Sequence, residues 1–427
     1  MQYHNGTDGV PSHLEEFHNG VHPRYVHFFR FALSTTNTLV RLPPDHDLAK
    51  LYPPFEQQFP VEQQDLTELW AGAGVAGVGF ETAGFKKTRI LENDPYALQT
   101  NIGNSSGHVE ILHVPDAATL EKPYAGCDFS AVLKGVHMQT IVLPSQIGVV
   151  TTTFPCTHNS GANAYKDGEK SEIDRASLPS DISMKILNAF PAHYGLLENL
   201  PALETNQPRT FAAYQALLLR SKYQLRKFRC NAAEYGLPQD RPRVFLVYAP
   251  SCCTLPVEPI PTHITETSIS ALLEPPTIRE AIGDVANDAV EDLYASPPQI
   301  SEQARRLIPH IKRPGNINDL RGSRWVKSGE KLDSCKRPSW NVPGETFGTV
   351  MCSSKKGDAH PIHDRKLNLR ERMRLQALPD NFIFYGPERE QYRQLGNGVP
   401  VAVTFAIAME IRKAMSQDER RGVCWGG

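Results

Sequence analysis

Between residues 65 and 250 the chain alternates between short apolar segments and longer stretches with apolar residues at helical spacing. Segments such as 147–150 and 243–248 have the length and composition of buried strands. Between them, Phe211, Tyr214, Leu217 and Leu218 fall on one face of a helix. Strands that alternate with helices in this way form a doubly wound sheet with helices on both faces. The pattern therefore predicts a Rossmann-like α/β fold.

The whole chain divides into four stretches by composition. Residues 1–62, rich in His, Pro, Asn and Gln, predict a partly irregular N-terminal arm, and residues 63–250 predict the α/β domain. Residues 251–340 are rich in Pro, Ser and Thr and predict a smaller, separate unit. Residues 341–427 regain helical patterning, which predicts a C-terminal segment that returns to the α/β domain.

Composition is that of a globular protein, with 40% hydrophobic and 22% charged residues. The formal net charge of −2 means that any surface for a nucleic acid must be a local patch. The eight cysteines include no Cys-x-x-Cys pair, which favours free thiols in a reducing compartment. Because no run of about 18 apolar residues occurs, we expect no membrane span.

A glycine-rich turn at residues 71–77 follows a predicted strand and precedes a predicted helix. Glycines at such a turn let the backbone approach a ligand at the N-terminus of a helix. Glu92 ends the next predicted strand, where a carboxylate can accept hydrogen bonds from ribose hydroxyls. An NAD site, an S-adenosylmethionine site and a tight turn without a ligand all fit this pattern.

Cys156 lies directly after another predicted strand, where α/β sheets carry their active sites. Pro155 restricts Phe154 to an extended backbone, which helps to aim the thiol out of the strand end. A cysteine becomes a strong nucleophile when nearby positive charge lowers its pKa. An isolated cysteine is more often an inert core residue. The residues at the neighbouring strand ends are therefore needed to distinguish a nucleophile from a core cysteine.

Two further polar segments also lie at predicted strand ends. Glu198 and Asn199 end one apolar segment, and Arg241 and Arg243 precede another. Taken singly, these segments also fit a helix cap and a solvent-exposed arginine pair. Three polar clusters at the ends of three strands, in this order, predict an active site.

Six segments with recognisable motifs follow one another along the chain: residues 68–74, 154–157, 198–200, 239–243, 365–380 and 391–400. They resemble, in order, the Asp-Leu-Phe-Ala-Gly-x-Gly, Pro-Pro-Cys-Gln, Glu-Asn-Val and Gln-x-Arg-x-Arg motifs and the two C-terminal motifs of the DNA cytosine-5 methyltransferase family. The resemblance covers residues 65–250 and 341–412. It implies the Rossmann-like sheet of an S-adenosylmethionine-dependent methyltransferase with a second, smaller target-recognition domain.

The resemblance implies methyl transfer from S-adenosylmethionine to C5 of a flipped-out cytosine in double-stranded DNA. Cys156 would add to C6 of the base, and Glu198 would hydrogen-bond N3. Asn199 would hold the nucleophile loop or the base edge. Arg241 and Arg243 would bind the base carbonyl or a nearby phosphate.

The resemblance also implies a set of cofactor-binding residues, namely Trp70, Gly72, Gly74, Glu92, Asp116, Asn397 and Val399. Trp70 would stack near the adenine or methionine part of the cofactor, and the two glycines would make room for it. Glu92 would hold the ribose. Asp116, with Asp128 as the alternative, would lie near the adenine amine. Asn397 and Val399 would line the pocket from the C-terminal side.

Several residues near the nucleophile depart from the family pattern. Phe154 replaces a proline, Thr157 replaces a glutamine and Asn159 replaces a phenylalanine. The chain between Asp116 and Cys156 is also longer than the family leads us to expect. These departures keep two alternatives open: a weakly active or inactive member that acts by binding DNA or chromatin, and an RNA cytosine-5 methyltransferase.

Residues 251–340 correspond in position to the target-recognition region of the family. They include a basic stretch suited to phosphate contacts, formed by Arg305, Arg306, Lys312, Arg313, Arg321, Arg324 and Lys327. A solvated charged face is the alternative, since Glu302 and Asp319 are interspersed. Because the region is short, we expect a brief target such as CpG or no strict sequence.

Other cysteine and histidine groups predict no further chemistry. His360, His363 and Cys352 provide three possible ligands without a fourth, so we expect no metal site. The adjacent Cys252 and Cys253 are interpreted as a packed pair. We expect a monomer. A eukaryotic, fungal-type protein would lie in the nucleus, which is the favoured interpretation, and a bacterial one would lie in the cytoplasm.

Overall fold

The computed structural model describes residues 64–105, 107, 109–111, 147–153, 192–263, 276–285 and 292–423. Contacts between Cα atoms divide the chain into two compact units. One unit, the sheet unit, contains the described parts of Phe55–Cys230, Pro242–Pro259 and Thr404–Gly427. The other, the small unit, contains Asn231–Arg241 and the described parts of Ile260–Val403. The boundaries predicted at residues 250 and 340 remain predictions, and the predicted arm, residues 1–62, lies outside the described residues.

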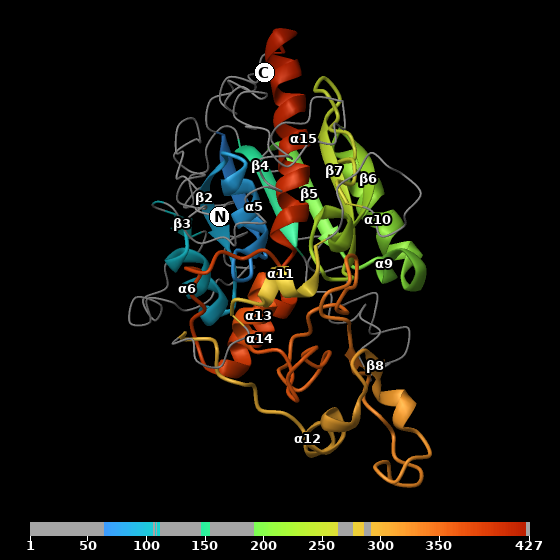
Figure 1. Ribbon diagram of the computed structural model, residues 1–427. Coiled ribbons are helices and arrows are strands. Elements are labelled where there is room, and N and C mark those ends of the chain that lie inside the picture. Colours follow the sequence, from blue (N-terminus) through green and yellow to red (C-terminus); the bar gives the residue numbers. More distant parts are fainter. Residues whose placement is uncertain are drawn as a thin grey trace, which may run out of the picture. The chain divides into compact units, whose positions relative to one another are not determined.

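A seven-stranded sheet forms the centre of the sheet unit, with the strand order β3-β2-β1-β4-β5-β7-β6 (Figure 1). Its strands are β1 (Asp65–Leu69), β2 (Lys86–Leu91), β3 (Glu110–Ile111), β4 (Ile147–Thr153), β5 (Ala192–Asn199), β6 (Tyr223–Asn231) and β7 (Pro242–Pro250). The first five strands are parallel, and β7 runs antiparallel to β5. From β1 the chain builds outward through β2 and β3, and it then returns to build β4 and β5 on the other side. The predicted Rossmann-like α/β fold is confirmed.

Helices of the sheet unit include α5 (Val75–Thr82), α6 (Pro95–Gly103), α9 (Ala202–Asn206), α10 (Pro208–Arg220) and α15 (Val401–Arg420), the last of which begins in the small unit. Local sequence explains where α6 begins. The Asp94 side chain accepts a hydrogen bond from the Ala97 N–H, and Pro95 occupies the first helical turn.

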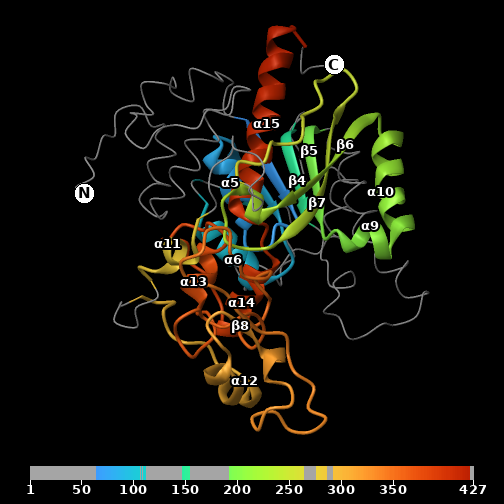
Figure 2. The same ribbon diagram turned by 45° about the vertical axis from the view of Figure 1, so that its right-hand side comes forward.

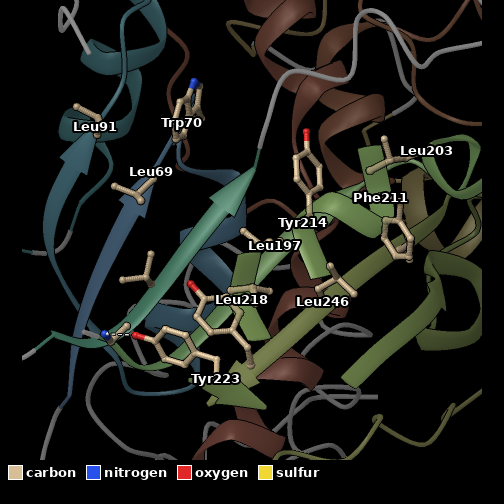
Figure 3. Close-up of a cluster of buried hydrophobic side chains, with 14 residues drawn as sticks. Leu69, Trp70, Leu91, Leu197, Leu203, Phe211, Tyr214, Leu218, Tyr223 and Leu246 are labelled. Atoms are coloured by element: carbon tan, nitrogen blue, oxygen red, sulfur yellow. Dashed lines mark hydrogen bonds between the residues drawn. The ribbon is translucent and has the colours of Figure 1, made fainter. Parts of the chain in front are cut away.

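One hydrophobic core of the sheet unit lies between the sheet and α10. Phe211, Tyr214 and Leu218 of α10 are buried against strand residues that include Leu197 and Leu246 (Figure 3). The predicted apolar face of this helix is therefore confirmed.

Helix α15 covers the opposite face of the sheet (Figure 2). Tyr194 of β5 points away from the α10 side, because side chains alternate along a strand, and its hydroxyl donates to Asp418 of α15 at 2.7 Å. Asp418 also accepts from the Thr254 N–H at 2.8 Å. In the described part of the chain, no single helix is long and apolar enough to cross a membrane, and α14 passes that test only jointly with the largely buried α15, across a 40° bend.

The small unit is built from short elements. They are η1 (Ala232–Tyr235), α11 (Ile278–Ile282), α12 (Glu302–Leu307), η2 (Ile308–His310), β8 (Gly315–Asn316), η3 (Ile317–Leu320), β9 (Lys336–Arg337), α13 (Leu369–Arg374) and α14 (Glu388–Asn397). Reciprocal capping fixes several of them; Asn368 and Glu371, for example, each bind the other's backbone N–H at the start of α13. Leu307, Ile308 and Ile317 form part of a separate hydrophobic cluster.

Candidate active site

The strand order reverses between β1 and β4, and doubly wound sheets bind their ligands outside the carboxyl ends of the strands at such a point. The ends of three strands are level there, because Leu69 of β1 pairs with Thr152 of β4, and Thr153 of β4 pairs with Glu198 of β5. The Thr153 hydroxyl donates to the Trp70 carbonyl at 2.8 Å. The carboxyl ends of β1, β4 and β5 therefore form one candidate site.

The chain leaves β1 through a turn with three residues in the left-handed region of backbone space. Trp70 has φ 52°, Gly72 has φ 54° and Gly74 has φ 78°. A Cβ added to Gly72 would meet no atom within 4 Å, so glycine there serves the backbone conformation and leaves the adjoining space open. Figure 3 shows Trp70 at the end of β1, beyond Leu69.

Glu92, directly after β2, ties this turn to the neighbouring strand. Its Oε2 accepts from the Gly72 N–H at 2.7 Å, and its Oε1 accepts from the N–H groups of Asn93 and Asp94, both at 2.8 Å. Burial raises the pKa of the Glu92 carboxyl, and the three N–H groups offset part of that rise. A carboxylate has about four acceptor positions, so Oε2 retains one for a hydroxyl group of a ligand.

A buried ionic network lies beneath the turn. Lys87 Nζ lies 3.1 Å from Glu68 Oε2 and 3.2 Å from Glu81 Oε2, and it donates to Asn101 Oδ1 at 2.9 Å. Burial opposes the charged ammonium, but the two carboxylates outweigh burial and raise the pKa of Lys87. Sequence reasoning missed Lys87 and Asn101, because neither residue belongs to a recognisable motif.

The network explains two of the glycines. A Cβ on Gly74 would lie 2.4 Å from Asn101 Oδ1, and a Cβ on Gly77 would lie 2.7 Å from Glu68 Oε1. Real Cβ atoms do not approach so closely, so the missing side chains make room for the network. That Gly74 also makes room for a cofactor stays a prediction.

Glu198 and Arg243, two of the predicted catalytic residues, lie together. Arg243 Nε is 3.0 Å from Glu198 Oε1, and only 8% and 9% of the two side chains are exposed. The pairing arises because β7 runs antiparallel beside β5, with Glu198 opposite Phe245. Asn199, also buried, accepts from the Leu200 N–H through Oδ1 at 2.8 Å.

Arg241 lies in a different environment. Its guanidinium is buried and donates to the carbonyls of Val350 at 3.0 Å and of Gly396 and Gly398, both at 2.7 Å. Asn397, between these two glycines, is exposed, whereas Val399 is buried. The two arginines of the Gln-x-Arg-x-Arg motif therefore have separate partners.

Other predicted residues are either elsewhere or not described. Cys156, Asp116, Asp128, Thr157 and Asn159 lie outside the described residues. His360 is buried and accepts backbone N–H groups, whereas Cys352 is exposed beside Asn397. Among the residues that the structure describes, no group of three or more His, Cys, Asp or Glu is placed to hold a metal ion.

Residues 65–413 match a family model described as C-5 cytosine-specific DNA methylase. The chain belongs to this family. It is 26% identical to DNA (cytosine-5)-methyltransferase 4 of Arabidopsis thaliana, over 82% of this chain and 28% of that protein. It is 25% identical to the type II methyltransferase M.Eco47II of Escherichia coli, over 86% of this chain and 84% of that protein. The chain thus spans less than a third of the length of its plant relative, and most of the length of the bacterial one. The family resemblance predicted from the motifs is confirmed.

Solved structures share the fold. The S. pombe Dnmt2 methyltransferase superposes with a TM-score of 0.53 at 14% identity, over 82% of this chain and 99% of that one. A putative DNA modification methyltransferase encoded within a prophage of E. coli superposes with a TM-score of 0.51 at 18% identity, over 83% of this chain and 99% of that one. At such identities the likeness establishes the fold.

Proposed function

We propose that the protein transfers a methyl group from S-adenosylmethionine to C5 of cytosine in double-stranded DNA. The observation that carries this proposal is the buried Glu198–Arg243 pair, with Glu198 opposite the last residue of β4, Thr153. Cys156 follows Thr153 by three positions in the sequence. A carboxyl group and a guanidinium thus lie together beside the end of β4, and Cys156 follows that strand in the sequence. Membership of the cytosine-5 methylase family supplies the chemistry.

The chemistry requires a base that has left the DNA stack, at a cost of a few kcal/mol. The Cys156 thiolate forms a bond to C6, and Glu198 hydrogen-bonds N3 and stabilises the protonated ring. C5 thereby becomes an enamine-like carbon. Loss of the C5 proton after methylation expels the Cys156 thiolate and restores the aromatic ring. Arg243 orients the Glu198 carboxylate and donates through Nη1 to the Pro242 carbonyl at 2.8 Å, and its remaining N–H groups would bind the base carbonyl.

The end of β1 fits the proposed cofactor. S-adenosylmethionine supplies an electrophilic methyl group on a sulfonium. Gly72 leaves open space beside the turn, and Glu92 Oε2 retains an acceptor position for a ribose hydroxyl. We assign Trp70, at the end of β1, to the adenine or methionine part through the family motif that it matches. We assign Asn397 and Val399 to the same ligand through the family motif that they match.

DNA contacts are proposed for the basic stretch of the small unit. Arg306 is paired with Glu330, and Arg313 Nη2 lies 2.5 Å from Asp364 Oδ1, so these two arginines also serve the unit's own structure. The other members of the stretch are solvent-exposed, namely Arg305, Lys312, Arg321, Arg324 and Lys327. Exposed lysines and arginines suit DNA phosphates, which would position the duplex without reading its sequence.

Transfer of a radiolabelled methyl group from S-adenosylmethionine tests the proposal. Equal amounts of duplex DNA and tRNA are offered to the wild-type protein and to Glu198→Gln. We expect label in the duplex, and at least about 100-fold less with Glu198→Gln, because a group that acts on a proton in the transition state contributes that much. Label in tRNA alone would identify an RNA methyltransferase. No label in either, with cofactor binding intact, would leave a protein that acts by binding.

A further inference from the structure

The Gln-x-Arg-x-Arg motif has two parts with different partners. Arg243 pairs with Glu198, whereas the side chains of Gln239 and Arg241 bind backbone groups of other segments. Gln239 is fully buried; its Nε2 donates to the Leu375 carbonyl at 2.7 Å, and its Oε1 accepts from the Val350 N–H at 3.1 Å. The first part of the motif therefore fastens separate backbone segments to one another.

Arg241 makes most of these hydrogen bonds between segments. One guanidinium group donates to the carbonyls of Val350, Gly396 and Gly398, so it bridges the segment around Val350 and both sides of Asn397. Such a fork of rigid donors is a property of arginine, and a lysine ammonium does not reproduce it. Loss of this side chain would remove a hydrogen bond from each of the three carbonyls, which would destabilise the 396–398 segment.

Asn397 is also held through its own side chain. The Cys352 thiol donates to Asn397 Oδ1 at 3.0 Å. The backbone of Cys352 packs so tightly on Gly396 that a Cβ there would lie 2.5 Å from Cys352 Cα. With Oδ1 occupied by the thiol, the amide presents its Nδ2 donor to the surroundings, where Asn397 is exposed.

We propose that Arg241 is a positioning residue, which holds residues 396–398 in the conformation that presents the Asn397 amide to the methyl donor, and that it does not contact the target base. This assignment rests on the proposed function, because Asn397 is assigned to the cofactor there. The two arginines of one motif then have different roles: Arg241 contributes to cofactor affinity, and Arg243 contributes to the chemical step.

Calorimetric titration with S-adenosylmethionine, together with steady-state kinetics on duplex DNA, separates the two roles. We expect Arg241→Met to raise the Kd and the KM for S-adenosylmethionine about tenfold or more, with kcat at saturating cofactor retained. Arg243→Lys, the matched control, should lower kcat and leave the cofactor Kd unchanged. Arg241→Lys, which keeps the charge, should still weaken cofactor binding.

Two further measurements guard against a misfolded Arg241 variant. Cys352→Ala removes the exposed contact to Asn397 and should raise the cofactor Kd by a few-fold, whereas Cys352→Ser should stay near wild type. Added ethylguanidinium should restore cofactor binding to Arg241→Ala. A wild-type cofactor Kd in both Arg241→Met and Cys352→Ala, or a loss confined to kcat in Arg241→Met, would overturn the positioning role alone. A wild-type protein that binds no S-adenosylmethionine would overturn the proposed function as well.

Discussion

Acid should destabilise this protein through one buried histidine. His360 is fully buried in the small unit, and its Nδ1 accepts hydrogen bonds from the backbone N–H groups of Ile362 at 3.2 Å and His363 at 3.1 Å. Because Nδ1 is the acceptor, the neutral ring carries its proton on Nε2, which lies 3.5 Å from Glu371 Oε1. The folded protein therefore holds this ring neutral.

The magnitude follows from the pKa. Burial, with added repulsion from Arg365, His363 and Arg337, lowers the pKa of His360 from 6.5 to about 2. At a pH below 6.5, the pKa of the histidine in the unfolded chain, the unfolded chain binds a proton that the folded protein does not. The contribution of His360 to stability is therefore fully present above pH 6.5 and is lost as the pH decreases towards the folded pKa. Each pH unit in this window costs about 1.4 kcal/mol, which amounts to about 2 kcal/mol at about pH 5.

Urea unfolding at about pH 7.5 and about pH 5 measures this loss. His360→Asn keeps an acceptor near the position of Nδ1 without a titrating ring. Between about pH 7.5 and about pH 5, the free energy of unfolding of this variant should therefore fall by about 2 kcal/mol less than that of the wild type. His363→Asn serves as a control for the adjacent ring. Equal losses in the wild type and in His360→Asn would refute the reasoning.

Two further predictions concern the network beneath the glycine turn. Lys87→Met leaves the buried Glu68 and the partly buried Glu81 without this cation, which should reduce the free energy of unfolding by about 3–5 kcal/mol in urea. A variant as stable as the wild type would show that the network is dispensable. Gly77→Ala should cost about 1–3 kcal/mol, because its Cβ would lie 2.7 Å from Glu68 Oε1 and from Lys87 Cε, and thermal unfolding checks this. Gly72→Ala has room for its Cβ and should cost only about 1 kcal/mol for the left-handed backbone, so a larger loss for Gly72→Ala than for Gly77→Ala would contradict the packing argument.

Much of the sheet unit could be predicted from the sequence, because buried strands and helices have apolar residues at a characteristic spacing. Apolar segments predicted the strands, and Phe211, Tyr214 and Leu218 predicted the buried face of α10. The direction of β7 could not be predicted in this way, because an apolar pattern does not indicate whether a strand runs parallel or antiparallel to its neighbour. That direction places Arg243 beside Glu198.

Contacts between residues that are distant in the sequence also could not be predicted from local sequence patterns. Arg241 and Arg243 are two positions apart and chemically identical, yet they bind different parts of the molecule. Lys87 and Asn101 carry no motif, and only the approach of β2 and α6 reveals their contact. Gly74 matches a cofactor motif, but the structure also gives it a packing partner in Asn101.

Covalent trapping on a duplex oligonucleotide that carries 5-fluorocytosine tests the central claim most directly. Fluorine at C5 does not leave as a proton does, so in the presence of S-adenosylmethionine an active enzyme remains attached to the base. We predict a band of reduced mobility in denaturing electrophoresis, present with the wild type and absent with Cys156→Ala. No band on the duplex, with cofactor binding intact, would contradict DNA methylation through Cys156.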